Sequence, residues 1–114
     1  DNPELKAHLA WSNYLAGELA RKRGKPDQAL EFYITSEKQF DEALDAIVRE
    51  EWLVNQTFVF GAIGDALVAQ NEKEGALSYF QAGRDQLQPV LKPYAHRKWH
   101  ALFRHMDEQV KSLN

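Results

Sequence analysis

Histidine and acidic side chains are the groups in this sequence that could do metal or acid–base chemistry. His96 and His100 lie four positions apart, a spacing that puts two imidazoles on one face of a helix and can hold zinc. A zinc site would need a third ligand, and two of the three residues between these histidines are cations, which disfavour a bound dication. His105 and Asp107 are two positions apart, so on a helix they point away from each other. The spacings argue against both a metal site and a catalytic pair.

Patterns for nucleophilic catalysis and phosphate binding are missing from the sequence. There is no cysteine, which excludes disulfides, thiolate metal ligands and thiol nucleophiles. No serine lies on a sharp turn beside a plausible base, and there is no glycine-rich phosphate loop. Gly61 and Gly64 lie inside a helical pattern, where close helix packing explains them better. We therefore expect a protein that is not an enzyme and has no cofactor.

Length and composition indicate one ordinary globular domain. The chain has 114 residues, 44% of them apolar and 27% charged, with a net charge of -3. No apolar run approaches the roughly 18 residues that would span a membrane, and no signal-peptide pattern is present. We expect no membrane partner and a cytoplasmic location. Because residue 1 is Asp rather than Met, we also expect that residues 1–114 are a single domain excised from a longer protein.

The first half of the chain is predicted to form two helices. Asn2 and Pro3 are typical of a helix start, and Gly24 is well placed as a left-handed residue after the helix end. The second helix opens at Pro26 and Asp27 and continues toward Glu51, with its break expected somewhere in 49–57. The apolar stripe of the first helix comprises Leu5, Leu9, Ala16, Leu19 and Ala20. That of the second comprises Leu30, Tyr33, Phe40, Leu44 and Ile47, with Glu37 on the same seam, which suggests an exposed edge or a polar contact across it.

Residues 57–90 are predicted to form two further helices, and a last helix is expected from about Tyr94 to Leu113. The polar stretch 71–74 separates the third helix from the fourth, and Pro89 ends the fourth. No stretch alternates with period two, so we expect no strands. The stripe of the last helix, suited to docking on the preceding pair, comprises Trp99, Leu102, Phe103, Met106, Val110 and Leu113.

The pattern in 57–90 resembles the tetratricopeptide repeat family, whose helix-turn-helix units are 34 residues long. The large and small residues of its first helix are matched by Phe60, Ile63, Gly64 and Leu67, and those of its second helix by Ala76, Phe80 and Gly83. A weaker copy precedes it at a spacing of 47 residues, from Ala29 to Ala76, so the second helix is expected to be about three turns longer than in a regular repeat. At this spacing the matched pairs are Gly17 with Gly64, Gly24 with Asn71, and Tyr33 with Phe80.

The resemblance implies a concave binding face formed by the first helix of each pair. On this sequence, that face carries Trp11, Tyr14, Glu18, Arg21, Phe58 and Asp65, with Ala69 at its edge. Aromatic anchors beside charges suit a peptide or protein partner. Glu18 and Asp65 stand where the carboxylate-clamp members of the family have asparagines, which argues against an acidic C-terminal peptide as ligand. The alternative is that Trp11 and Phe58 are core residues packed under the long helix.

Charge is unevenly distributed along the chain. Residues 31–51 hold seven acids and two bases, whereas no acid lies between Asp85 and Asp107. A basic surface is therefore expected from Lys92, Arg97, Lys98 and Arg104. This basic surface could pair with the acidic helix of a second copy, meet RNA or DNA, or be simply solvated. Four permanent charges without a Gly- or Arg-rich arm make a thin case for nucleic acid.

We therefore expect an all-α domain of about five helices, with two antiparallel pairs and a C-terminal capping helix. Its expected role is protein–protein interaction as a scaffold or regulatory module, with a possible homodimer. The alternative function is a nucleic-acid-binding module that uses the basic C-terminal helix.

Overall fold

The computed structural model describes residues 2–114, and this range contains helices but no strand. The all-α prediction is confirmed. The elements are α1 (Pro3–Lys22), α2 (Pro26–Ala46), α3 (Glu50–Ala69), α4 (Lys73–Leu87), the 3-10 helix η1 (Gln88–Val90) and α5 (Arg97–Leu113).

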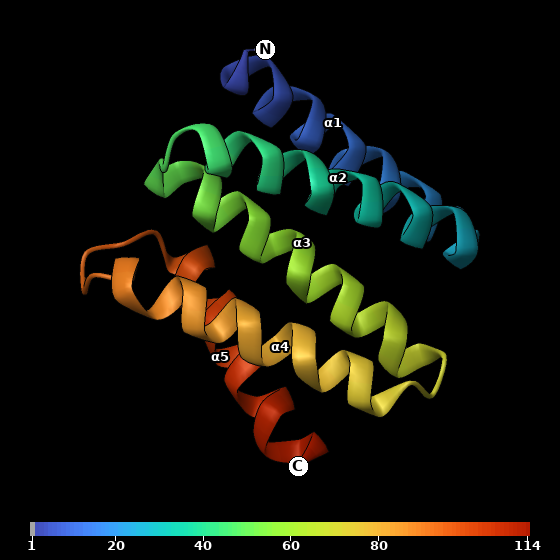
Figure 1. Cartoon of the computed structure of the whole chain (residues 1–114). Helices are drawn as coiled ribbons and strands as arrows, with labels where there is room; N and C mark the ends of the chain where they lie inside the picture. The colour runs from blue at the N-terminus through green and yellow to red at the C-terminus, as the bar shows by residue number, and fades with distance from the viewer. Residues whose placement is uncertain (1) are drawn as a thin grey trace.

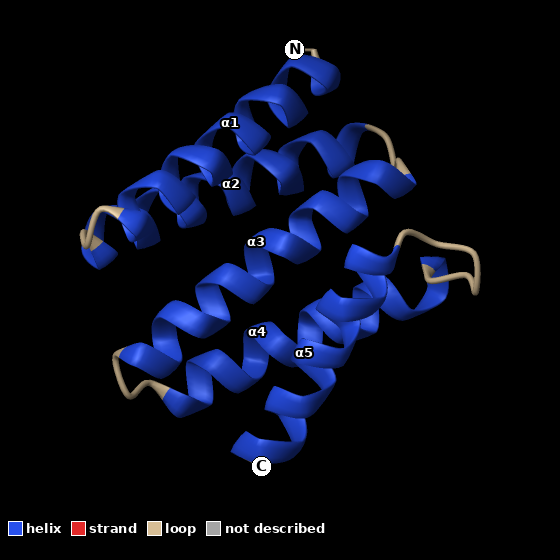
Figure 2. Ribbon diagram, turned by 180° about the vertical axis from the view of Figure 1, so that it is seen from behind, coloured by secondary structure: helices blue, strands red, loops and turns tan. Residues whose placement is uncertain are grey.

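Helices α1 to α4 follow one another in antiparallel succession, and α5 lies against α4 (Figures 1 and 2). The closest pairs are α1 with α2 and α3 with α4, as the two predicted hairpins require. The α2–α3 interface joins the hairpins, and α5 packs mainly on α4 with a smaller contact to α3. The molecule measures 37 × 34 × 22 Å, so it is about two helix diameters thick.

The turns of the two hairpins have the same backbone geometry. Gly24 has φ +74° and Asn71 has φ +63°, and these residues are separated by the 47 positions that relate the two predicted copies. Glycine and asparagine are the residues that adopt this left-handed conformation most readily. At the start of α1, the Asn2 side chain accepts hydrogen bonds from the backbone N–H groups of Glu4 and Leu5, as expected of an N-cap.

Three boundaries differ from the prediction. Helix α2 ends at Ala46 and α3 begins at Glu50, so the two helices are separated at residues 47–49. The break had been expected later, within residues 49–57. Ile47 is extended, with φ -156° and ψ 135°, and no glycine or proline marks the change. The residues by which the 47-residue spacing exceeds a regular repeat are therefore shared between the end of α2 and the start of α3. They do not form three additional turns of α2 alone. Helix α5 begins at Arg97 instead of about Tyr94, because the His96 side chain caps it by accepting from the Lys98 backbone N–H.

Each hairpin holds an aromatic ring against a glycine of its first helix. A Cβ added at Gly17 would lie 2.5 Å from the Tyr33 ring, and one added at Gly64 would lie 2.6 Å from the Phe80 ring. Both glycines therefore allow an approach that any larger residue would obstruct. The two pairs occupy matching positions at the 47-residue offset, so the internal repetition expected from the sequence extends to packing.

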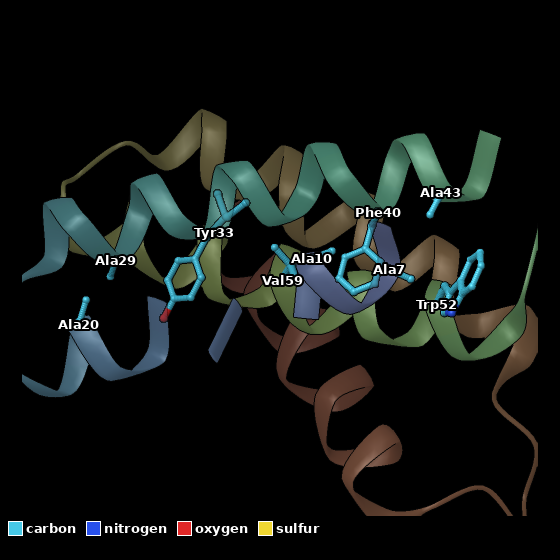
Figure 3. Close-up of a cluster of buried hydrophobic side chains, with 10 residues drawn as sticks. Ala7, Ala10, Ala20, Ala29, Tyr33, Phe40, Ala43, Trp52 and Val59 are labelled. Carbon is cyan, nitrogen blue, oxygen red and sulfur yellow. The ribbon is translucent and has the colours of Figure 1, made fainter. Parts of the chain in front are cut away.

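The interior is organised in two clusters. The first lies between α1, α2 and α3 (Figure 3) and contains Ala7, Ala10, Ala20, Ala29, Tyr33, Phe40, Ala43, Trp52, Val59 and Ile63. The second, between α3, α4 and α5, contains Val54, Ala76, Phe80, Leu87, Met106 and Val110. The α5 stripe is confirmed, since Met106 and Val110 are buried and its other members pack against the second cluster.

The α1 stripe is not the buried face of that helix. Only Ala20 among its members is buried, whereas Leu5, Leu9 and Leu19 are 57%, 47% and 49% exposed. The core side of α1 consists of the small residues Ala7, Ala10, Gly17 and Ala20, which let α1 and α2 approach closely.

A polar seam crosses the outer side of the stack. The Tyr79 hydroxyl donates to Glu37 Oε1 over 2.8 Å, so Glu37 makes the polar contact that its position on the apolar seam suggested. Gln56 is buried and donates to Asp41 Oδ1 over 2.6 Å, while its own Oε1 accepts from Gln86 over 3.1 Å. These bonds tie α2, α3 and α4 together and satisfy buried polar atoms.

Among the helices of residues 2–114, α3 alone is long and apolar enough, by length and composition, to cross a membrane. Half of its apolar window is buried, and α3 packs between α2 and α4. A central helix of a folded domain has the same composition, so this feature alone does not indicate a membrane segment.

Candidate functional site

The inner face between α1 and α3 carries a ridge of three aromatic side chains. Trp11 stacks on Tyr14 with ring centroids 4.8 Å apart and meets Phe58 edge-on at 6.4 Å. All three are half-buried. Trp11 also packs against the first buried cluster and Phe58 against the second, so both side chains are part core and part surface of this face. We call this face, with the hollows on either side of the ridge, the α1–α3 groove.

The first hollow has a volume of about 440 Å³ and lies toward the C-terminal ends of α1 and α3. Small side chains leave the space open, because Ala62, Ala66 and Ala69 succeed one another along α3. Five of the six predicted partner-binding residues line this hollow: Tyr14, Glu18, Arg21, Phe58 and Asp65.

The second hollow, of about 420 Å³, lies toward the N-terminal ends of the same two helices and is lined by Trp11, the sixth predicted residue. Its walls are more polar. The Arg49 guanidinium lies 4.9 Å from the centre of the Trp52 ring and 3.3 Å from Glu4 Oε1, which joins α1 to the start of α3. The ridge of Trp11 and Phe58 separates this hollow from the first.

Glu18 is held firmly in the wall of the first hollow. Arg21 donates to both of its oxygens, over 3.2 and 3.3 Å, and the Tyr33 hydroxyl donates to Oε2. Burial acts to raise the pKa of the Glu18 carboxyl, but the hydrogen bonds from Arg21 and Tyr33 outweigh it and hold the pKa below its usual range. Glu18 is therefore an ionised and preoriented acceptor at neutral pH.

Asp65 supplies a second carboxylate from the opposite wall. Its Oδ1 lies 2.7 Å from His105 Nε2, and the His105 ring meets the Phe80 ring edge-on at 5.7 Å. Within residues 2–114, the other oxygen of Asp65 has no hydrogen-bonding partner, and the side chain is half-exposed. Asp65 can therefore accept a hydrogen bond from a ligand in the groove.

The Tyr14 hydroxyl lies near Glu18, Arg21 and Asp65. Burial, with added repulsion from the Glu18 carboxylate, raises the pKa of Tyr14 to about 12. The hydroxyl is therefore a neutral hydrogen-bond donor at physiological pH. It makes no side-chain hydrogen bond within the described residues, which leaves it free for a ligand.

The predicted basic surface lies in the loop before α5 and on that helix. Lys92, Arg97, Lys98 and Arg104 are exposed in the loop before α5 and along that helix, and in the described part of the chain none forms an ion pair. None of the four lines the two hollows of the α1–α3 groove, although Lys98 lies one turn before Leu102 on α5, and Glu108 lies one turn beyond Arg104 on the same side of that helix.

The histidines considered as metal ligands have separate surroundings. His96 uses Nδ1 to cap α5, and His100 Nε2 is buried without a hydrogen-bonding partner among the residues that the structure describes. In residues 2–114, no three His, Asp or Glu side chains gather closely enough to hold a metal ion.

The contributions of α5 to the groove were not predicted. Leu102 of α5 lines the first hollow, and His105 orients Asp65 from the same helix. At the 47-residue offset Leu102 corresponds to Asn55 and His105 to Phe58, but the alignment of the two hairpins did not extend to α5 and so did not reveal them. Comparison with models of known protein families, with curated proteins and with solved structures finds no match to the chain.

Proposed function

We propose that the domain is a short tetratricopeptide-like array that binds a segment of a partner protein in the α1–α3 groove. The aromatic ridge of Trp11, Tyr14 and Phe58 between two hollows is the observation that carries this proposal. Half-buried aromatics that border open, largely preformed space are the usual anchors of protein recognition. The relation to tetratricopeptide repeats is supported by the matched turns and matched glycine–aromatic pairs of the two hairpins.

The chemistry of the first hollow indicates what the partner segment presents. Its interior is apolar, with Phe58, Leu102 and the alanines of α3, and so accepts an apolar side chain. Glu18 and Asp65 place carboxylates on both walls, and the Tyr14 hydroxyl adds a donor. An apolar residue followed closely by lysine or arginine matches this arrangement, whereas an acidic C-terminus does not. We infer that the domain acts by binding and not by catalysis.

A displayed library of random peptides would test the groove directly. We expect peptides selected on the wild-type domain to combine an apolar residue with a nearby basic one. Ala66→Trp fills the first hollow and should abolish their binding. Ala101→Trp adds the same bulk to the exposed side of α5 and should leave binding unchanged. Equal binding to both variants would place the site elsewhere and reject the proposal.

Truncation of the ridge provides the second arm of this experiment. Trp11→Ala and Tyr14→Ala should each abolish binding of the selected peptides while helicity, followed by circular dichroism, is retained. If either variant unfolds, that residue serves the core, and Ala66→Trp alone decides the question.

A further inference from the structure

The outer side of α1 carries a row of exposed apolar side chains that no part of residues 2–114 covers. We call it the outer stripe, and define it as the exposed leucines Leu5, Leu9 and Leu19 with the exposed polar Ser12 and the half-buried Ala16 between them. These residues recur every three or four positions, so they form one continuous line along the helix. The stripe lies on the side of α1 away from its core residues Ala10 and Gly17, and it does not include the aromatic ridge of the groove.

The internal repetition of the chain shows that residues at the matching positions of α3 pack against a helix. At the 47-residue offset, its five members correspond to Trp52, Gln56, Val59, Ile63 and Ala66 of α3. Trp52, Val59 and Ile63 belong to the same buried cluster as residues of α2, and Gln56 donates to Asp41 of α2. The outer stripe is therefore the counterpart of the surface with which α3 packs against α2.

The second helix of the first hairpin repeats the correspondence. Phe32 of α2 is 37% exposed and lies beside Leu19 at the edge of a hollow of about 260 Å³. Its counterpart at the same offset is Tyr79, which reaches back to Glu37 of α2. In the second hairpin, α3 and α4 use these positions to contact α2. In the first hairpin, α1 and α2 carry exposed side chains at the corresponding positions.

Together with the neighbouring Leu15, the leucines of the stripe are complementary to themselves when read in the opposite direction. Leu5 and Leu19 lie seven residues on either side of Ser12, and Leu9 and Leu15 lie three residues on either side, so two antiparallel copies of α1 place leucine against leucine. Leu15 is also exposed, at 51%.

The charges beside the stripe agree with an antiparallel pair. Glu4 and Lys22 are 18 residues apart, about five turns, and therefore lie on the same flank at opposite ends of α1. Glu4 already pairs with Arg49 of its own chain over 3.3 Å, but its side chain is 60% exposed, and in an antiparallel pair it also approaches the end of the partner's α1 that carries Lys22. The two helix macrodipoles point in opposite directions, which is also favourable.

We propose that this protein forms a two-fold symmetric dimer in which the outer stripes of two α1 helices pack antiparallel about Ser12. A two-fold interface requires one patch to fit itself, which this stripe does. A helix of 20 residues is about 30 Å long, so the contact is small by the standards of stable dimers and should depend on concentration in the micromolar range.

The chain contains no cysteine, so single introduced cysteines report the arrangement without background. Ser12→Cys lies on the two-fold axis and should form a disulfide-linked dimer under mild oxidation, at twice the chain mass of 13.1 kDa. Leu19→Cys should not cross-link alone, but should when Leu5→Cys is present in the same chain. Ser78→Cys, exposed on α4, is the control for random collision. Efficient cross-linking of Leu19→Cys alone would indicate parallel helices and overturn the proposal.

Light scattering across a range of concentrations supplies the independent arm. Leu9→Glu should weaken the wild-type dimer about tenfold or more, because it would bury an unpaired charge. Ile34→Glu changes a residue of similar exposure on the side of α2 away from α1, and should leave the dimer intact. A wild-type chain that stays monomeric at every concentration would reject the proposal. A dimer that survives Leu9→Glu but dissociates in salt would reject it in favour of pairing between the acidic α2 and the basic α5.

Discussion

Phe80 lays its ring directly against the backbone of Gly64. A Cβ added at Gly64 would lie 2.6 Å from both Cε1 and Cζ of that ring, far inside van der Waals contact. Phe80 is fully buried at the centre of the second cluster, so its ring has little room to move aside. The glycine therefore sets the distance between α3 and α4.

Gly64→Ala should destabilise the domain by about 1–2 kcal/mol, because overpacking outweighs the better helix propensity of alanine. Urea unfolding followed by circular dichroism measures this change. Gly75→Ala is the matched control, since its methyl group meets only the flexible end of Leu67, at 3.3 Å, and should change the stability much less. Combining Gly64→Ala with Phe80→Leu should cost less than the sum of the two. Additive losses would contradict the contact.

The two left-handed turn residues allow a test of backbone conformation alone. Nothing lies within 4 Å of a Cβ built at Gly24, so Gly24→Ala changes only the cost of φ +74° and should lose about 1 kcal/mol. Asn71→Gly should instead raise stability slightly, since glycine adopts φ +63° without strain. Thermal unfolding of the two variants should therefore shift in opposite directions, and shifts of the same sign would reject the assignment.

These turns could be predicted from sequence because their cause is local: Gly24 and Asn71 favour the same backbone region wherever they occur. The end of α2 could not. Ile47 and Val48 carry no breaker signal, yet α2 stops at Ala46 and Trp52 is buried in the first cluster, so local sequence alone does not account for the end of the helix. β-branched side chains lower helix propensity only slightly.

The buried side of α1 was also hidden from the pattern of large apolar residues. Close packing on α2 requires Ala10 and Gly17, which carry little hydrophobic signal, whereas Leu5 and Leu9 carry more and are exposed. The groove was easier to predict, because the 47-residue offset placed α1 and α3 in register. The part contributed by α5 was missed because the two-hairpin alignment did not extend to that helix, although α5 begins 47 residues after α3.

The free energy of unfolding should depend on pH through Glu37, because the folded state disfavours the charged form of its carboxyl group. Burial, which outweighs the hydrogen bond from Tyr79, raises the pKa of Glu37 above its usual 4.5. The folded state then binds a proton more tightly than the unfolded state, so this group costs stability above its folded pKa and the cost fades as the pH falls. Glu37→Gln keeps an acceptor for Tyr79 without the charge, and should gain up to about 1 kcal/mol at pH 7.

The comparison residue for this pH dependence is Glu18, whose pKa is shifted the other way. Its contribution is present above pH 4.5, the usual value, and is lost as the pH falls through the lower folded value. Glu18→Gln should therefore lose stability at pH 7. Urea unfolding of both variants from pH 3 to pH 8 checks the signs. Equal responses of the two variants would show that burial does not govern Glu37.

Removing one hydroxyl at a time distinguishes Tyr33, whose hydroxyl is bound within the protein, from Tyr14, whose hydroxyl faces the groove. Tyr33 donates to the ionised Glu18, so Tyr33→Phe should lose about 1 kcal/mol of stability. Tyr14→Phe removes a hydroxyl without an intramolecular partner in the described residues and should leave the unfolding free energy nearly unchanged.

If the groove binds peptide, the effects of the two substitutions on peptide affinity should be in the opposite order, with Tyr14→Phe the more damaging. Tyr14→Phe should then weaken binding of a selected peptide several-fold, because a ligand group loses its donor. A loss of stability in Tyr14→Phe as large as that in Tyr33→Phe would show that the Tyr14 hydroxyl serves the fold, and that the hollow offers its ligand no free donor there.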